Sequence, residues 1–211
     1  MFGDGSLTFR EFAMREPLPL ATIQDAVLEF LRGRGDAVLF GAQAVNAYVD
    51  KARATEDVDV MSPRAEELAG EIRAFLNQRF HIAVRVRSVR GGIGFRVYQV
   101  RKPKNRHLVD VRLVTALPPH QRVEGVSVLT PAALAASKVM SIAGRGNTVE
   151  GMMDRADLGR LLLAFPKLKV EKGLVATCLR DLEAAEEAFA VWKEVVAQDI
   201  RAQGEDEEFR G

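Results

Sequence analysis

Two stretches of sequence decide the fold: Leu39-Phe40-Gly41-Ala42-Gln43-Ala44-Val45 and Arg53-Ala54-Thr55-Glu56-Asp57-Val58-Asp59. The apolar run over residues 37–40 lies between glycines, which predicts a short buried strand. Gly41 then allows a tight turn into a helix that reaches about Tyr48. Polar and apolar residues alternate over 57–60, which predicts a second strand with both aspartates on one face and both valines on the other.

Further strands and helices follow on both sides of these stretches. A helix is predicted over 19–31, and Ser62 and Pro63 suit the N-cap and first residue of another helix. Alternation predicts strands over 81–88 and 95–100, and the glycines between them predict a hairpin. A third alternating stretch, 107–114, carries Asp110.

The remainder of the chain reads almost wholly as helix. Helices are predicted over 131–142 and 149–164, with two more within 171–203. The fold class is therefore α/β (α+β), a mixed-sheet core followed by a helical C-terminal part. The composition changes near Pro118, which predicts domains at 1–120 and 121–211. Residues 1–17 read as an irregular or edge segment, and residues 204–211 as a frayed tail.

The bulk composition excludes several classes of protein. With 47% hydrophobic and 28% charged residues, the chain can bury a core, so global disorder is excluded. The net charge of +1 by itself indicates neither a nucleic-acid nor a membrane partner. Cys178 is the one cysteine, so no intramolecular disulfide can form. No secretory signal and no apolar run long enough for a bilayer are found, so the expected location is the cytoplasm, without a membrane partner.

Three carboxylates form the candidate site. Asp57 and Asp59 share one face of a strand, and Asp110 lies among apolar residues of a later strand. Like charges this close need a counterion, and a hard divalent cation such as Mg²⁺ or Mn²⁺ suits carboxylate ligands. The alternatives are a solvated strand face and, for Asp110, an ion pair with Arg112 or Arg106.

These residues resemble the nucleotidyltransferase superfamily, and they are most similar to its AbiEii-type branch, known from toxin–antitoxin and phage-abortive systems. The resemblance covers roughly residues 37–165. It rests on the glycine turn, the Arg-x-Thr-x-Asp-x-Asp segment at 53–59, the third aspartate and a helical part with Asp154 and Asp157, which read as structural. The resemblance implies the metal-binding and catalytic residues Asp57, Asp59 and Asp110, and the nucleotide- and phosphate-binding residues Gly41, Ala42, Arg53, Lys138 and Arg145. Ala42 departs from the usual Gly-Ser or Gly-Gly turn, so a phosphate-binding hydroxyl is missing.

The activity implied is transfer of a nucleoside monophosphate from a nucleoside triphosphate to an acceptor hydroxyl. By resemblance the acceptor is tRNA, another protein or a small molecule such as an aminoglycoside. The segment 82–109 holds eight Lys and Arg and no acidic residue, so the basic hairpin 85–106 favours tRNA or another RNA. The protein would then be a toxin with an antitoxin partner.

Other functions remain open. Ala42 also fits an inactive nucleotidyltransferase-fold partner that acts like an antitoxin. A metal-dependent phosphohydrolase is less favoured, because the usual His–Asp metal spacing is missing, and His81, His107 and His120 are given no catalytic role. The C-terminal helices would support a homodimer.

Overall fold

The computed structural model describes residues 18–202, so the predictions for residues 1–17 and 204–211 fall outside the described part. The chain divides into two compact units between Thr130 and Pro131. The first unit contains the strands and the second is helical, which confirms the predicted class of a mixed sheet followed by helices.

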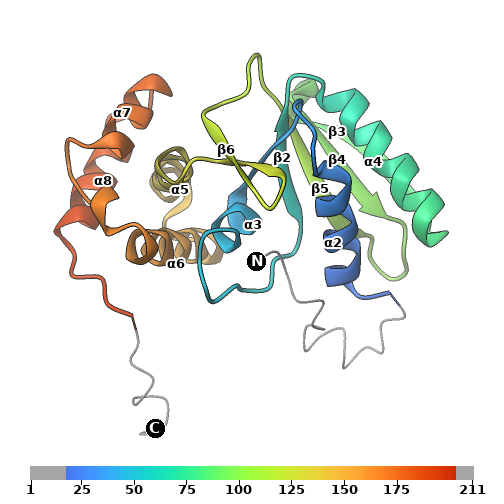
Figure 1. Ribbon diagram of the computed structural model, residues 1–211, viewed down its shortest axis with the longest axis horizontal. Coiled ribbons are helices and arrows are strands. Elements are labelled where there is room, and N and C mark those ends of the chain that lie inside the picture. Colours follow the sequence, from blue (N-terminus) through green and yellow to red (C-terminus); the bar gives the residue numbers. More distant parts are fainter. Residues whose placement is uncertain (1–17, 203–211) are drawn as a thin grey trace, which may run out of the picture. The chain divides into compact units, whose positions relative to one another are not determined.

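Within residues 18–202, seven strands form one mixed sheet in the order β3-β4-β5-β2-β1-β7-β6 (Figure 1). The strands are β1 (Val38–Phe40), β2 (Val58–Ser62), β3 (Val84–Val89), β4 (Gly94–Gln99), β5 (Arg106–Leu113), β6 (His120–Val123) and β7 (Val126–Leu129). The pairs β2–β5 and β1–β7 are parallel, and the other neighbours are antiparallel. The two central strands of the predicted site, β2 and β5, are therefore direct neighbours.

Helices α2 (Leu20–Leu31) and α4 (Ala65–Phe80) pack on the sheet and on each other. Val58 and Val60 of β2 and Val109 of β5 are fully buried, and burying each such side chain stabilises the fold by about 1.5–3 kcal/mol. Because side chains alternate along a strand, Asp59 and Asp110 lie on the opposite face, called here the carboxylate face. The short helix α3 (Gly41–Asn46) connects β1 to the loop before β2, and the single turn η1 (Arg90–Gly92) connects β3 to β4.

Two local features differ from the sequence prediction. The helix predicted to begin at Pro63, with Ser62 as its N-cap, begins at Ala65, because Ser62 still belongs to β2 and is fully buried. Strands β6 and β7 were not predicted; they form a hairpin around Glu124 and Gly125, which both have positive φ. Such a two-residue turn is usually signalled by Asn-Gly or Asp-Gly rather than Glu-Gly. This hairpin adds β6 and β7 to the sheet next to β1.

The second unit is a group of helices around α5. Its elements are α5 (Pro131–Arg145), α6 (Val149–Ala164), η2 (Pro166–Leu168), α7 (Leu174–Asp181) and α8 (Glu186–Ala197). Helix α5 packs against α6, α7 and α8, and Leu134, Leu158 and Trp192 are buried in this core. No helix within residues 18–202 has the length and apolar character needed to span a membrane.

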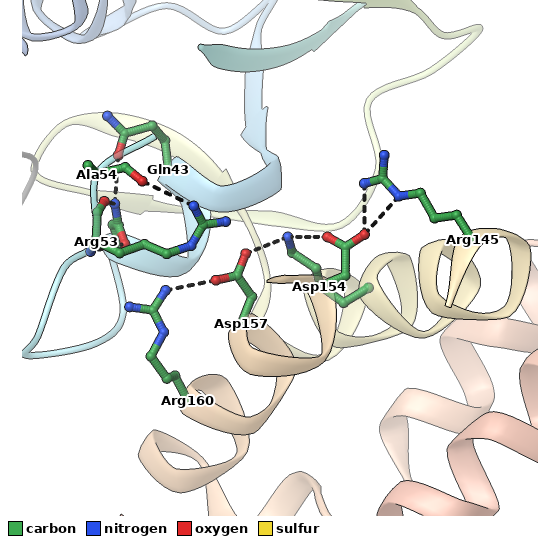
Figure 2. A network of polar contacts seen from close by, with 9 residues as sticks. Gln43, Arg53, Ala54, Arg145, Asp154, Asp157 and Arg160 are labelled. Atoms are coloured by element: carbon green, nitrogen blue, oxygen red, sulfur yellow. Dashed lines mark hydrogen bonds and ion pairs between the residues drawn. The ribbon is translucent and has the colours of Figure 1, made fainter. Parts of the chain in front are cut away.

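A buried ion-pair network joins α5 to α6. Lys138 is only 5% exposed, and its Nζ donates to Asp154 Oδ1 at 2.8 Å and to Asp157 Oδ2 at 2.7 Å. Figure 2 shows that Arg145 and Arg160 also donate to these two aspartates. Since both carboxylates are almost fully buried, each needs these cations to offset the loss of water.

Replacing Lys138 with methionine is expected to destabilise the protein. The variant keeps the apolar stem of the side chain but leaves Asp154 and Asp157 without their shared buried cation, a loss of about 3–5 kcal/mol for a broken buried pair. Chemical denaturation of Lys138→Met against wild type measures this loss. Lys172→Met, at an exposed lysine, is the control and is expected to change the unfolding free energy little. Equal stability of the two variants would show that the network contributes nothing.

Candidate functional site

The parallel pairing of β2 with β5 brings the three predicted carboxylates together. The register places Asp59 beside Asp110, and Asp57 immediately precedes β2 on the same face as Asp59. Asp57, Asp59 and Asp110 each offer a carboxylate oxygen, and these atoms all lie within 4.8 Å of one another. All three residues are partly exposed, so an ion from solvent can reach them.

Gly41 makes room for one of these carboxylates. It has a φ of +73°, and a Cβ built on it would lie 2.0 Å from Asp59 Oδ2. Only glycine combines the left-handed backbone with this missing side chain at low cost. Gly41 therefore lets the Asp59 carboxylate pack closely against the turn between β1 and α3.

The loop before β2 is anchored by two buried amides. Asn46 Nδ2 donates to the Arg53 carbonyl at 2.8 Å, and the Arg53 N–H donates back to Asn46 Oδ1 at 3.1 Å. Gln24 Nε2 donates to both the carbonyl and the hydroxyl oxygen of Thr55, at 3.1 Å each. These bonds fix the chain two residues before Asp57. The sequence placed Thr55 in the turn but gave no signal for Gln24 or Asn46, whose partners are distant along the chain or in an irregular loop.

Arg96 is the counterion of Asp110. Its Nε and Nη2 donate to the two oxygens of Asp110, both at 2.8 Å. The side-chain hydrogen bond to Asp110 raises the pKa of Arg96, and the negative charges of Asp57 and Asp59 act in the same direction. Sequence reasoning proposed Arg112 or Arg106 as the partner, but the pairing of β4 with β5 sets Arg96 opposite Asp110. The register between β4 and β5 determines which arginine meets Asp110, and the alternation of residues within one strand does not contain this register.

A bulge brings His107 to the same site. Val97 pairs with Val109 and Tyr98 with His107, so the register passes over Leu108. The extra residue turns His107 toward the carboxylate face. Its Nδ1 lies 3.8 Å from Asp57 Oδ2, and its Nε2 lies 3.8 Å from Asp110 Oδ1. Burial lowers the pKa of His107, which favours the neutral ring. Strict alternation would have put His107 on the buried face, so the sequence did not reveal it.

The chemistry of the three carboxylates fits a divalent cation. Burial, followed by the charges of Asp110 and Glu56, raises the pKa of Asp57 from 3.8 to about 6, and Arg96 opposes this rise only in part. Mg²⁺ and Mn²⁺ prefer such oxygen ligands, so Asp57, Asp59 and Asp110 are suited to hold either ion.

The remaining predicted phosphate-binding residues lie in both units. Ala42 is in the first turn of α3, and Arg53 donates from Nη1 to the Ala54 carbonyl at 3.1 Å (Figure 2). Lys138 is held by Asp154 and Asp157, and Arg145 donates to Asp154 Oδ2 at 2.7 Å. A phosphate-binding role for these residues stays a prediction.

Substitution of Gly41 by alanine is expected to weaken metal binding. The new Cβ would overlap Asp59 Oδ2 and force the carboxylate away from Asp57 and Asp110. A loss of roughly 10–100-fold in Mn²⁺ affinity is expected, the range typical when the groups that orient metal ligands are altered. Titration of Mn²⁺ followed by electron paramagnetic resonance measures it. Gly35→Ala is the control, because nothing lies within 4 Å of a Cβ there. Unchanged Mn²⁺ affinity in Gly41→Ala would show that Asp59 is not a metal ligand.

The raised pKa of Asp57 predicts a pH-dependent response to metal. Because the folded pKa of about 6 exceeds the usual 3.8, the metal-free protein loses stability as the pH rises from 3.8 to about 6, and the loss is complete above that pH. Mg²⁺ binds the ionised form, so its stabilising effect grows over the same window. The rise in melting temperature on adding Mg²⁺ should be larger at pH 7.5 than at pH 5.

Asp57→Asn is expected to remove this difference and to raise the melting temperature of the metal-free protein at pH 7.5. Asp50→Asn, at an exposed aspartate, is the matched control and should behave like wild type. An equal effect of Mg²⁺ on wild type at both pH values would contradict the prediction.

Comparison with known proteins supports the fold. No family model and no curated protein matches the chain in sequence. Among solved structures, the megavirus polyadenylate synthase matches with a TM-score of 0.61 and 14% identity over 74% of this chain. This chain spans only 34% of the viral synthase. The JHP933 protein of Helicobacter pylori matches with a TM-score of 0.55 and 14% identity, over 90% of this chain and 94% of that one. The chain thus has a fold like that of nucleotidyltransferases, with a carboxylate triad in its sheet.

Proposed function

We propose that this protein is a metal-dependent nucleotidyltransferase that moves a nucleoside monophosphate from a nucleoside triphosphate to an acceptor hydroxyl. The observation that carries the proposal is the convergence of Asp57, Asp59 and Asp110 on two adjacent parallel strands. In a sheet of the nucleotidyltransferase type, three oxygen ligands within 4.8 Å are suited to hold Mg²⁺ or Mn²⁺ beside a triphosphate.

Each carboxylate has a proposed part in this chemistry. Asp57 and Asp59 hold the metal, and Asp110 completes the ligand set and accepts the proton of the acceptor hydroxyl. When bound there, the metal stabilises the charge that develops on the transferred phosphoryl group and on the leaving pyrophosphate. Arg96 fixes the orientation of Asp110 through two hydrogen bonds, so the third ligand is aligned before substrate binds.

Phosphate contacts are proposed for the residues around the β1–α3 turn and in the helical unit. The backbone of Gly41 and Ala42 would face the phosphates, with Arg53, Lys138 and Arg145 as charged contacts. For Lys138 such a contact would compete with its bonds to Asp154 and Asp157. The same proposal assigns the metal and nucleotide site to a domain of residues 1–120 and the contacts of Lys138 and Arg145 to a domain of residues 121–211.

We propose RNA, with tRNA favoured, as the acceptor. In the strand register, Arg87 of β3 lies opposite Arg96 of β4, and Arg96 lies opposite Asp110 of β5. Strands β3 and β4 therefore extend the carboxylate face with positive charge. Arg85 and Arg87 are exposed on β3. An exposed basic strip continuous with the metal ligands suits a polyanionic backbone that leads a terminal hydroxyl to the site.

The finer assignment to the AbiEii-type branch rests on the Arg-x-Thr-x-Asp-x-Asp segment at 53–59. It carries with it the proposed role of a growth-arresting toxin with an antitoxin partner. A second candidate, an inactive partner that acts like an antitoxin, is favoured only by Ala42, which supplies no hydroxyl to a phosphate.

The decisive experiment is a label-transfer assay. Purified protein is incubated with each α-labelled nucleoside triphosphate in turn, Mg²⁺ and total tRNA. Label is expected to move to RNA with wild type and to fall by at least about 10²-fold in Asp57→Ala/Asp59→Ala, because the charge-stabilising centre is lost. Asp50→Ala, at an exposed aspartate, is the matched control and should keep full activity.

The assay also separates the alternatives. Label transfer that persists in the double variant would show that Asp57 and Asp59 are not the catalytic metal ligands. Triphosphate binding without transfer to tRNA would redirect the search to a protein or small-molecule acceptor. Neither binding nor transfer would favour the inactive partner.

A further inference from the structure

Two arginines border the carboxylates on the same face of the sheet, and they are held in different ways. Arg96 gives two hydrogen bonds to Asp110. Arg112 follows Asp110 by two residues on β5, so it projects from the same face. Its guanidinium carbon lies 4.7 Å from the centre of the Phe40 ring. Within residues 18–202, no side chain or carbonyl accepts a hydrogen bond from Arg112 and no carboxylate forms an ion pair with it.

The position of Phe40 places this guanidinium at the metal site. Phe40 pairs with Asp59 in the β1–β2 register and immediately precedes Gly41. Asp59, in turn, is packed against Gly41. A guanidinium stacked on a ring uses its flat face for the contact and leaves the N–H groups at its edge for other acceptors. Arg112 therefore lies beside the carboxylates, and within residues 18–202 its N–H donors form no hydrogen bond.

The charges nearby indicate what Arg112 would bind. Burial and the neighbouring Arg90 lower the pKa of Arg112, while Asp59 and Asp110 oppose this shift without forming a bond to it. Any phosphate that approaches three carboxylates is repelled unless cations lie between or beside them. A metal on Asp57, Asp59 and Asp110 supplies one such charge, and a planar guanidinium at the border supplies another. Arginine also matches phosphate oxygens with two parallel hydrogen bonds.

We propose that Arg112, held on the ring of Phe40, binds the polyphosphate chain of the nucleoside triphosphate. This inference rests on the proposed function and adds a binding residue to it. Arg112 donates hydrogen bonds to non-bridging phosphate oxygens and makes no covalent contribution. Stacked on Phe40, the guanidinium forms no ion pair with Asp59 or Asp110, so its charge is not used internally as that of Arg96 is.

The proposal is tested with inorganic tripolyphosphate and Mg²⁺, because this probe carries the phosphate chain without a base. Calorimetry on the full chain compares wild type with Arg112→Gln and Arg112→Lys. Arg112→Gln should weaken binding about 10-fold or more, as expected for the loss of charge-assisted hydrogen bonds. Arg112→Lys should lose less, because it keeps the charge but not the fork. Inorganic monophosphate should be bound weakly by all variants.

Arg73→Gln is the matched control, since Arg73 is an exposed arginine on α4, the helix that packs on the opposite face of the sheet. It should change tripolyphosphate affinity by less than about twofold. Mn²⁺ affinity without phosphate should not fall in Arg112→Gln, which shows that the variant is folded with its carboxylates in place. Phe40→Leu keeps an apolar residue but removes the ring, and should weaken tripolyphosphate binding in part.

Several outcomes would overturn the proposal: tripolyphosphate bound equally by Arg112→Gln and wild type, an equal loss in Arg73→Gln, or no binding by wild type. The result is separable from the proposed function. If tripolyphosphate binding depends on Arg112 but no nucleotide is transferred, Arg112 is a polyphosphate-binding residue and the proposed nucleotidyltransferase activity is wrong. If nucleotide is transferred but Arg112→Gln binds tripolyphosphate as wild type does, the proposed activity is supported and the proposed role of Arg112 is wrong.

Discussion

The parallel pairing of β2 with β5 is the constraint on which the site depends. It joins segments that are about fifty residues apart in the chain and sets Asp59 directly beside Asp110. A slip of one residue would turn one of the two carboxylates to the helix-covered face, where an unpaired charge is costly. The fully buried Val58, Val60 and Val109 prevent this slip, since the same shift would move them to the carboxylate face. The hydrophobic effect thus fixes the geometry of a charged site.

Three neighbouring carboxylates repel one another, and the surrounding structure offsets this repulsion in several ways. Arg96 neutralises Asp110, and the turn at Gly41 accepts Asp59 without a steric clash. The amides of Asn46 and Gln24 fix the loop that leads into Asp57. Asp57 still carries a strain, because burial and then the charges of Asp110 and Glu56 raise its pKa. Strongly shifted pKa values of this kind are common at functional sites, because the stability they cost is recovered when a ligand binds the ionised form.

The sequence predicts the periodic features well and the long-range ones poorly. Alternation over 57–60 and 107–114 places Asp57, Asp59 and Asp110 on strands, and the apolar run before Gly41 places β1. Neither pattern contains the order of strands or their register, so the Arg96–Asp110 pair could not be predicted. His107 was missed because a bulge at Leu108 breaks the alternation. The β6–β7 hairpin was missed because Glu124 is an unusual residue for its turn. Lys138 could be placed on a helix, but its burial between two aspartates depends on how α5 packs against α6.

The position of β3 at one edge of the sheet has a consequence for self-association. An edge strand exposes unpaired backbone groups that can join the edge of another molecule and begin aggregation. Exposed Arg85 and Arg87 on β3 would bring like charges together if two copies paired there. At the opposite edge, β6 is only four residues long and carries the exposed Arg122. The arginines that extend the carboxylate face therefore also protect the sheet against edge-to-edge assembly.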